Sequence, residues 1–409
     1  MYACMMGVFL SVVQPQPEPR VLPERPPGAT EVIKPDAENF VVRRGYRVSA
    51  AVEEIPAARF LECDDRGTLY VSRPDRGDII ALRDNDGDGV YETRADFVTG
   101  KPSVHGMSFH DGWLWFATSG SIHRARDTNG DNTADEVMDV IPIGSLPMKG
   151  AHWWRSLVVT DDGLFTSIGD GANISDQRDT ERQKIWKYSL DGSGKTMFAS
   201  GIRNNEKLRF RPGTKELWGF DHGSDNFAGV IGPAPGAQAI TDLNPPDEFN
   251  LYTPGGFYGH PFLVGDRIPR PEYINRPDLP ELAAQTTPPE FSIPAHWAVN
   301  GFTFIDPEVN QKTKGFPADH AGDAFIAAHG SWNSSRLVGY CVARVLFDEG
   351  KPYGLLKIVS TIDASSGLVW ARPVDCVQAP DGSILFSSDA PTGRVFRIRY
   401  VGEAADAPK

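Results

Sequence analysis

The stretch 59–71 reads RFLECDDRGTLYV, an apolar segment followed by a turn around Gly67 and a second apolar segment. Looser or closer copies of this phrase follow in the stretches 105–116, 155–165, 203–218, 300–325 and 372–386. The turn glycines Gly67, Gly112, Gly163 and Gly213 are spaced by 45, 51 and 50 residues, which is the period of a four-stranded propeller blade. The six copies therefore predict an all-β fold, a six-bladed β-propeller whose antiparallel four-stranded blades surround a central channel.

The composition agrees with one large turn-rich domain. The 409 residues include 41 glycines and 33 prolines, and apolar residues seldom recur at helical spacing, so helix should be scarce. We expect an N-terminal tail over residues 1–40, the propeller over 41–401 and a short tail over 402–409. The formal charge of −13 argues against nucleic acid and against anionic membrane surfaces as partners, because both require clustered basic residues.

The N-terminus indicates export. Residues 1–13 are mostly apolar and a proline-rich stretch, 14–27, follows them, as in a short signal segment joined to a linker. A run of this length is too short to cross a bilayer, which takes about 20 residues, so we expect a periplasmic or secreted protein with no membrane span. The four cysteines, Cys4, Cys63, Cys341 and Cys376, lack metal, redox or haem-attachment spacing and are interpreted as free thiols.

Two acidic loops share one pattern of oxygen-bearing side chains. The first carries Asp84, Asp86, Asp88 and Glu92, and the second carries Asp127, Asn129, Asp131 and Asp135. Alternating oxygens around a glycine turn can surround a hard cation such as calcium, and a solvated turn explains the pattern equally well. Because the loops are 43 residues apart, they should occupy equivalent outer hairpins, and any calcium there would be structural.

The long segment Asn226–Asn300 interrupts the repeat. It contains the turn-rich stretches Pro245–Glu248 and Gly255–Pro261. Long ordered loops on a rigid scaffold often build a binding site. We therefore expect this segment either to help form a site or simply to cover one face of the propeller.

Polar residues recur near the ends of the repeated phrases. In a propeller these ends converge on the central channel, so residues far apart in sequence should surround one pocket. The candidates are His105, His152, Arg203, Asn204, His222, Asn300, His329 and Arg372. A histidine-bound metal is weakly supported, because no His-x-His or His-x-x-x-His pair occurs among them.

The sequence lacks the motifs of two other kinds of catalysis. No Gly-x-Ser-x-Gly elbow and no Gly-x-Gly-x-x-Gly turn after a strand is present, which argues against serine-hydrolase and nicotinamide chemistry. Arginines beside histidine and asparagine suit a carboxylate-bearing ligand, with an imidazole available to accept a proton.

At these residues the chain resembles the soluble quinoprotein sugar dehydrogenases, a family that includes soluble glucose dehydrogenase, sorbosone dehydrogenase-like proteins and pyranose dehydrogenase propeller domains. The resemblance extends from about residue 40 to residue 401. It rests on the order and spacing of the stretches 150–155, 167–170, 201–204, 221–225, 245–248, 329–333 and 372–375. It implies a six-bladed propeller that binds pyrroloquinoline quinone (PQQ) and a calcium ion.

The resemblance also implies roles for individual residues. His152 matches the general base that takes the proton of the substrate hydroxyl. Arg203 and Asn204 match residues beside the reactive quinone carbonyl, and His222, His329 and Arg372 fall at further cofactor contacts, with Arg372 on a carboxylate. Gly223 and Ser224 match the pair whose backbone oxygens hold the active-site calcium. The family usually has proline and glycine where Asn205 and Lys207 stand, and proline where Ser224 stands.

The sequence thus predicts PQQ- and calcium-dependent oxidation of a sugar or related alcohol or aldehyde. Because no haem motif is present, electrons would pass to an external acceptor such as a cytochrome. One alternative is a calcium-dependent lactonase-like propeller, which would require Glu, Asn and Asp ligands at the channel rather than the His and Arg noted above. A non-catalytic propeller that binds carbohydrate or protein is the other alternative.

Overall fold

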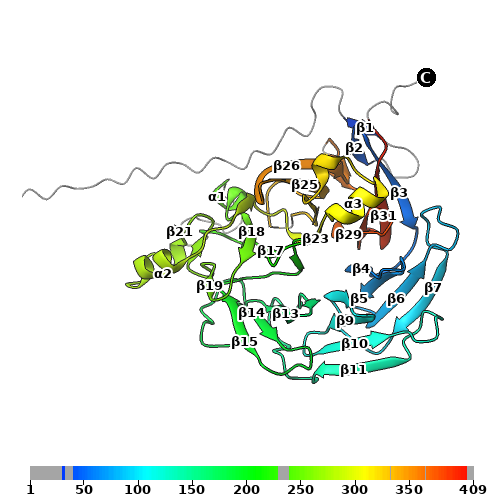
Figure 1. Ribbon diagram of the computed structural model, residues 1–409. Helices are drawn as coiled ribbons and strands as arrows, with labels where there is room; N and C mark the ends of the chain where they lie inside the picture. Colours follow the sequence, from blue (N-terminus) through cyan, green and yellow to red (C-terminus); the bar gives the residue numbers. More distant parts are fainter. Residues whose placement is uncertain (1–29, 33–39, 229–238, 332, 364, 403–409) are drawn as a thin grey trace, which may run out of the picture.

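The computed structural model describes residues 30–32, 40–228, 239–331, 333–363 and 365–402. Within these ranges, six sheets are arranged around a common centre (Figure 1). The six predicted repeats coincide with the first two strands of the six sheets, so the prediction of an all-β six-bladed propeller is confirmed.

The blades are numbered in chain order from the innermost strand outward. Blade 1 contains β4 (Leu61–Cys63), β5 (Leu69–Arg73), β6 (Asp78–Arg83) and β7 (Thr93–Val98). Blade 2 contains β8 (Met107–His110), β9 (Trp113–Ala117), β10 (Ile122–Arg126) and β11 (Glu136–Ile141). Blade 3 contains β12 (Val158–Thr160), β13 (Gly163–Ile168), β14 (Lys184–Tyr188) and β15 (Thr196–Ser200), joined by β19 (Gly256–Phe257).

The second half of the ring follows the same plan. Blade 4 contains β16 (Leu208–Phe210), β17 (Leu217–Asp221), β18 (Asp247–Tyr252) and β22 (Phe291–Ile293). Blade 5 contains β23 (Val299–Phe304), β24 (Ala324–Ala328), β25 (Cys341–Asp348) and β26 (Lys351–Ser360), extended by β2 (Val41–Arg43) and β1 (Thr30–Val32). Blade 6 contains β29 (Pro373–Gln378), β30 (Ile384–Ser388), β31 (Arg394–Tyr400) and β3 (Tyr46–Val52).

The ring is closed by strands from the two ends of the described chain. Strand β3 pairs antiparallel with β31, with Tyr46 opposite Tyr400, and Figure 1 shows blue β3 beside red β31. The innermost strands are neighbours all the way round, from β4 through β8, β12, β16, β23 and β29 back to β4. Blades 1 and 4 therefore face each other across the channel.

Two sheets are wider than the predicted four strands. Blade 5 has six strands because β2 pairs with the outer strand β26 and β1 pairs with β2. Blade 3 gains the short parallel strand β19. Both additions lie on outer strands, where backbone groups have no neighbouring strand within the blade. Strand β1 belongs to the predicted N-terminal tail, whereas the apolar run 1–13 and residues 403–409 lie outside the described residues.

The segment Asn226–Asn300 is only partly an insertion. It supplies β18 and β22, which complete blade 4. The remainder forms α1 (Ala239–Leu243), the hairpin β20 (Leu263–Val264) and β21 (Ile268–Pro269), the 3-10 helix η1 (Pro271–Tyr273) and α2 (Leu279–Gln285). Helix is scarce elsewhere, with α3 (Pro307–Thr313) and the 3-10 helix η2 (Ala318–His320) inside blade 5. Another small hairpin joins β27 (Ile362–Asp363) to β28 (Leu368–Val369).

The core lies between the blades, because each sheet is covered on both faces. Strand β9, with sequence WLWFA, is buried along its whole length, as expected for a strand packed on two sides. Between blades 4 and 5, Phe220 stacks on Phe249 with ring centroids 4.1 Å apart, and Phe302 meets both rings edge-on. This packing makes the propeller a rigid frame for residues at the strand ends.

The remaining sequence predictions concern loops, thiols and membranes. The acidic loops connect β6 to β7 and β10 to β11, so they do occupy equivalent outer hairpins. As predicted, Cys63, Cys341 and Cys376 form no disulfide bond within the described residues, while Cys4 lies outside them. Among the helices of the described ranges, none is long and apolar enough to cross a membrane.

Candidate functional site

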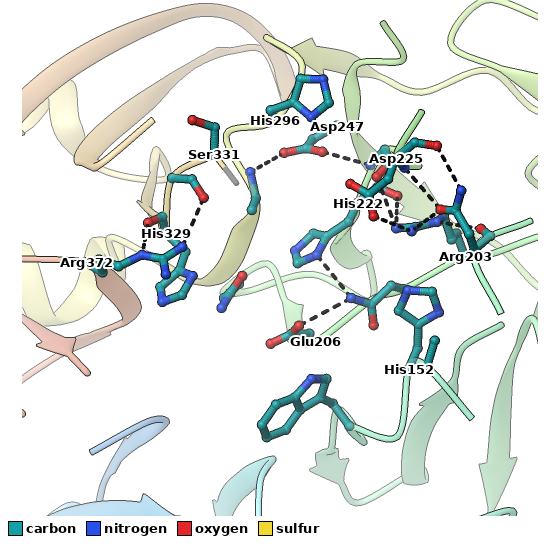
Figure 2. A pocket seen from close by; sticks show the side chains of 18 of the residues that line it. His152, Arg203, Glu206, His222, Asp225, Asp247, His296, His329, Ser331 and Arg372 are labelled. Carbon is teal, nitrogen blue, oxygen red and sulfur yellow. Dashed lines mark hydrogen bonds and ion pairs between the residues drawn. The ribbon is translucent and has the colours of Figure 1, made fainter. Parts of the chain in front are cut away.

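A cavity of about 510 Å³ opens at the face where the inner strands begin. Seven of the eight predicted channel residues line it: His152, Arg203, Asn204, His222, Asn300, His329 and Arg372. They come from different blades but project toward the same space (Figure 2). The volume lies within the usual range for small-molecule sites, about 300–1,000 Å³. The convergence predicted from the repeat is therefore observed.

His105, the eighth predicted residue, lies behind the cavity wall. Its side chain is fully buried, packs against Phe60 with the tilted ring centroids 4.0 Å apart, and approaches Glu206 with Nε2 at 3.6 Å. Burial lowers the pKa of His105 to about 4. His105 thus supports a residue that lines the cavity and does not itself reach it.

His152 is held with one ring nitrogen fixed and the other available. Its Nδ1 lies 2.8 Å from the backbone oxygen of Asp170. Because a carbonyl oxygen only accepts hydrogen bonds, Nδ1 carries the proton and Nε2 keeps its lone pair. Burial, and then the charge of Arg203, lower the pKa of His152 to about 3. The imidazole is consequently neutral at physiological pH and can accept a proton.

The segment that carries His152 is anchored by His260. The Nε2 of His260 lies 2.8 Å from Oδ2 of Asp170, whose backbone oxygen holds His152. Asp170 also accepts hydrogen bonds from the backbone N–H groups of Ala172 and Ser175. The segment 226–300 therefore helps to form the site, which is one of the two roles expected for it from the sequence.

Arg203 lies beside His152 and is fixed by several acceptors. Its guanidinium donates to the backbone oxygen of Asn173 at 2.9 Å, to Oδ1 of the same residue at 2.7 Å and to the backbone oxygen of Gly223 at 3.0 Å. The Asp225 carboxylate forms an ion pair with it at 3.6 Å. Burial lowers the pKa of Arg203, and its position is set before any ligand enters.

Asn204 and His222 form the adjoining part of the wall. The backbone N–H of Asn204 donates to Asp221 at 2.6 Å, and its side-chain amide lies 3.1 Å from Nδ1 of His222. The Nε2 of His222 lies 2.8 Å from the backbone oxygen of Val299 on β23. His222 is therefore tied to blades 4 and 5 at once, which fixes the ring at their junction.

The predicted calcium ligands differ in their access to the cavity. Gly223 lines it, and its backbone N–H donates to Asp247 at 2.8 Å. Ser224 is buried behind the wall, where its hydroxyl accepts a hydrogen bond from Arg270. Since calcium prefers oxygen ligands, the Gly223 carbonyl and the nearby Asp225 and Asp247 carboxylates offer suitable donors at this wall.

The opposite wall carries Arg372 and His329. Arg372 donates to the backbone oxygens of His329 and Gly330, both at 3.2 Å. No carboxylate of the described residues forms an ion pair with Arg372. The Nε2 of His329 lies 3.0 and 3.1 Å from the two carboxylate oxygens of Asp389, and burial lowers the pKa of His329. This wall can therefore receive an anionic group.

Sequence reasoning missed two charged residues at the floor of the cavity. Arg59 donates to Asp389 at 2.7 Å and forms an ion pair with Glu206 at 3.4 Å. Burial alone would raise the pKa of Glu206, but hydrogen bonding to His105 and the charges of His222 and Arg59 hold it well below its usual value. Arg59 is the first residue of its repeat, as Arg203 and Arg372 are of theirs. The sequence therefore contained the pattern that would have identified Arg59 as a site residue.

Other residues of the lining were also missed: Trp154, Asn173, Asp225, Asp247 and His296. Trp154 stacks on Trp153 at 3.6 Å and lies under the Arg59 guanidinium at 4.8 Å. Asp247 and His296 come from the segment 226–300, which has no repeat to predict their direction. Burial raises the pKa of Asp225. Figure 2 shows Asp225, Asp247 and His296 on the side away from Glu206.

The two acidic loops share their pattern of backbone hydrogen bonds, and in the first loop Asp84 accepts from the N–H groups of Gly87 and Gly89. Oxygens of Asp84, Asp86, Asp88 and Glu92 lie within 4.8 Å of one another, the only such group of acidic or histidine side chains found in the described residues. In the second loop, Asp127 accepts from the backbone N–H groups of Gly130 and Asn132. Asn129 and Asp135 bond to each other, and Asp131 accepts from Thr133.

The fold and cavity define a six-bladed β-propeller with a ligand-sized cavity at one face of its channel, and solved structures share this fold. The PQQ domain of pyranose dehydrogenase from Coprinopsis cinerea, in its holo form, superposes with a TM-score of 0.73 at 20% identity over 88% of this chain and 97% of the other. A calcium structure of family AA12 from Trichoderma reesei gives 0.73 at 18% identity over 90% and 99%. The soluble aldose sugar dehydrogenase of Escherichia coli gives 0.60 at 18% identity over 87% and 99%.

Residues 40–262 match the TrAA12-like family, and the chain belongs to that family. This membership confirms the resemblance found in the sequence. An uncharacterised protein of Borreliella burgdorferi is 28% identical over 250 residues, 58% of this chain and 57% of that protein. The match thus spans little more than half the length of that relative.

Proposed function

We propose that the protein oxidises a sugar or a related alcohol or aldehyde, using PQQ and calcium held in the cavity and passing the electrons to an external acceptor. The observation that carries this proposal is the placement of His152, with a neutral and available Nε2, beside the fixed guanidinium of Arg203. The solved structures of similar fold include a PQQ-bearing pyranose dehydrogenase domain and a calcium-bearing AA12 protein.

The donor set fits the cofactor. PQQ carries three carboxylates, and Arg59, Arg203 and Arg372 line the cavity from different blades. Of these, Arg372 offers a guanidinium without a described carboxylate partner, which suits charge-assisted binding of an anionic group. Trp154 also lines the cavity, with its ring already packed on Trp153 and under the Arg59 guanidinium. The Gly223 carbonyl, with Asp225 nearby, would hold calcium.

When bound, the quinone would supply the redox chemistry by accepting a hydride from the substrate carbon. The protein's own part is to hold the substrate hydroxyl near Nε2 of His152, which takes up its proton. Asp170 keeps that ring in one orientation through its backbone oxygen. Arg203 places a fixed positive charge beside the reacting atoms, where it would stabilise developing negative charge.

Reconstitution tests the proposal. Purified protein is mixed with PQQ, with and without calcium, and dye reduction is followed with a panel of aldoses, polyols and aldehydes. We expect calcium-dependent binding of PQQ and reduction of the dye by at least one compound. Absence of PQQ binding at micromolar concentration would refute the proposal.

A calcium-dependent lactonase is the second candidate, because the cavity lining fits such an enzyme better than the channel residues identified from the sequence did. Besides His and Arg, the cavity is lined by Glu206, Asp225 and Asp247 and by the amides of Asn173 and Asn204, which are the ligand types such an enzyme needs. Hydrolysis of a sugar lactone with calcium and without quinone would support this candidate. Calcium binding with neither activity would instead favour a binding propeller.

A further inference from the structure

His329 lines the cavity on the side opposite His152 (Figure 2). Its Nε2 lies 3.0 and 3.1 Å from the two carboxylate oxygens of Asp389. Because an ionised carboxylate only accepts hydrogen bonds, Nε2 carries the proton and Nδ1 keeps its lone pair. This Nδ1 has no hydrogen-bond partner among the described residues. The ring therefore presents an unoccupied proton acceptor.

The histidines of the cavity differ in what lies behind each ring. Four of them line the cavity, and within the described residues His329 alone among these four is paired with a carboxylate. The Nδ1 of His152 meets a backbone oxygen, whereas both ring nitrogens of His222 are engaged, by Asn204 and Val299. A carboxylate at one nitrogen stabilises the charge that the ring gains when the other nitrogen is protonated. His329 thus has the arrangement of a general base.

The charges that face His329 keep it neutral at rest. Burial lowers the pKa of His329 against the opposing effect of Asp389, and the charges of Arg59 and Arg372 lower it further. Burial alone would raise the pKa of Asp389, but hydrogen bonding from His329 and the charge of Arg59 hold it well below its usual value. A neutral imidazole backed by an ionised carboxylate can accept a proton and release it again to water.

The proposed oxidation leaves two protons in the cavity, and His152 accounts for only one. The substrate loses a proton from its hydroxyl oxygen, which Nε2 of His152 takes up, and a hydride from its carbon. The external acceptor then removes two electrons, one at a time, and the hydrogen that arrived as hydride remains as a proton. This second proton needs an acceptor of its own, because it appears only when the electrons leave.

The carboxylates of the lining are less suited to accept it. Asp247 accepts hydrogen bonds from two backbone N–H groups, and Asp225 is paired with Arg203. Although burial would raise the pKa of Glu206, hydrogen bonding and nearby positive charge hold it well below its usual value. The lone pair of His329 is therefore the better proton acceptor.

We propose that Nδ1 of His329, with Asp389 behind the ring, accepts the second proton as electrons leave the cavity for a one-electron acceptor. This inference rests on the proposed oxidation and adds a second base, which acts in reoxidation of the cofactor. The substrate loses two hydrogens, the acceptor gains two electrons, and the two protons reach water through His152 and His329.

Reoxidation can be measured without a sugar. Protein loaded with saturating PQQ and calcium is reduced anaerobically with dithionite and mixed with ferricyanide, and the absorbance of the cofactor gives the rate. His329→Gln should slow reoxidation by about 10²-fold, as general-base removal does. Glutamine keeps a donor for Asp389 and is uncharged at pH 7, as His329 is. The variant therefore removes the base without changing the charge of the cavity.

Two further measurements separate a base from a structural residue. Added imidazole should restore part of the lost rate in His329→Gln and leave the rate of the unmodified protein unchanged, because a free base can replace the missing one. His152→Gln should show the opposite pattern, with slow dye reduction by substrate and unaltered reoxidation by ferricyanide.

Imidazole ¹⁵N spectra of the protein without PQQ test the tautomer directly. At pH 7 the two signals lost in His329→Gln should come from a protonated Nε2 and an unprotonated Nδ1. A proton on Nδ1, unchanged reoxidation in His329→Gln, or slowing that imidazole does not relieve would overturn this proposal and leave the proposed oxidation intact. Failure of PQQ to bind would refute both.

Discussion

Glu206 and Lys207 are consecutive in the chain but place their charges in two different parts of the central channel. Glu206 lines the floor of the cavity, where it meets Arg59 at 3.4 Å and His105 at 3.6 Å. Lys207 is buried and forms a 2.7 Å ion pair with Asp375, whose side chain is fully buried. Both residues come from blade 4, yet the two regions differ in whether every charge has a partner of opposite charge.

The lower region is a closed ionic cluster, made of Lys207, Asp375, Arg209 and Glu62. Lys207 also donates to the Leu61 oxygen at 3.1 Å, and Arg209 pairs with Glu62 at 2.9 Å. Arg209 and Glu62 lie on β16 and β4, the inner strands of opposite blades, so their contact spans the channel. A side chain at Gly301 would collide with Asp375, since a Cβ there would lie 2.1 Å from its Oδ1.

The region around the cavity, by contrast, keeps side-chain groups that can bind a ligand. Arg372 has only backbone acceptors among the described residues, and Nε2 of His152 is available to a ligand. Buried charge therefore serves two purposes in one channel. Paired charges close its lower part, and incompletely paired ones prepare its upper part for a ligand.

The largest effect expected from a single substitution comes from breaking the ionic cluster. Lys207→Met leaves the Asp375 carboxylate buried without its cation, so the free energy of unfolding should fall by about 3–5 kcal/mol. Urea denaturation at neutral pH measures this change. The control is Lys215→Met, because the Lys215–Asp162 pair is on the surface and should contribute less than about 1 kcal/mol. Equal losses in the two variants would contradict the distinction.

Removing the proposed base should affect turnover rather than binding. His152→Ala is expected to keep PQQ affinity but to lower turnover by about 10²-fold or more, as general-base removal does. Steady-state dye reduction and cofactor titration provide the two measurements. His110→Ala, a histidine outside the cavity paired with Asp161, is the matched control. Unchanged turnover in His152→Ala would place the chemistry elsewhere.

Acid should destabilise the region around the cavity. The pKa values of His105 and His260 are lowered to about 4 by burial, and that of His152 to about 3. Between pH 6.5 and 4 the unfolded chain therefore binds more protons than the folded one, so stability falls as pH falls.

From pH 7 to pH 5 each of these histidines should cost on the order of 2 kcal/mol of stability. Urea denaturation of the unmodified protein at several pH values tests the sign and the window. A stability that stays constant or rises toward pH 5 would show that these rings are not held neutral in the folded state.

The smallest expected effect concerns Arg372. Arg372→Met should weaken PQQ binding about tenfold, through loss of a charge-assisted contact, and should leave the free energy of unfolding nearly unchanged. Lys207→Met should show the reverse, with altered stability and unaltered PQQ affinity in the folded protein. If Arg372→Met destabilised the fold as strongly as Lys207→Met, the two regions would not differ as described.

Much of the fold and part of the site could be predicted from sequence. The repeated phrase specifies a blade because period-two apolar strands joined by glycine turns have few other stable arrangements. The positions at which the repeats begin also identified four channel residues, since equivalent strand ends meet at a channel. These residues are His152, Arg203, Asn204 and Arg372. Arg59 obeys the same rule and was overlooked.

Other features were decided only by the tertiary structure. Asp247 and His296 approach the cavity because β18 and β22 complete blade 4. These two strands lie within an apparent insertion, and no local sequence pattern indicates that they pair with the blade. The same holds for Lys207, because only its contacts with blades 1 and 6 show that it closes the channel. Repeats encode local strand geometry, whereas the pairing of buried charges depends on which distant blades face each other.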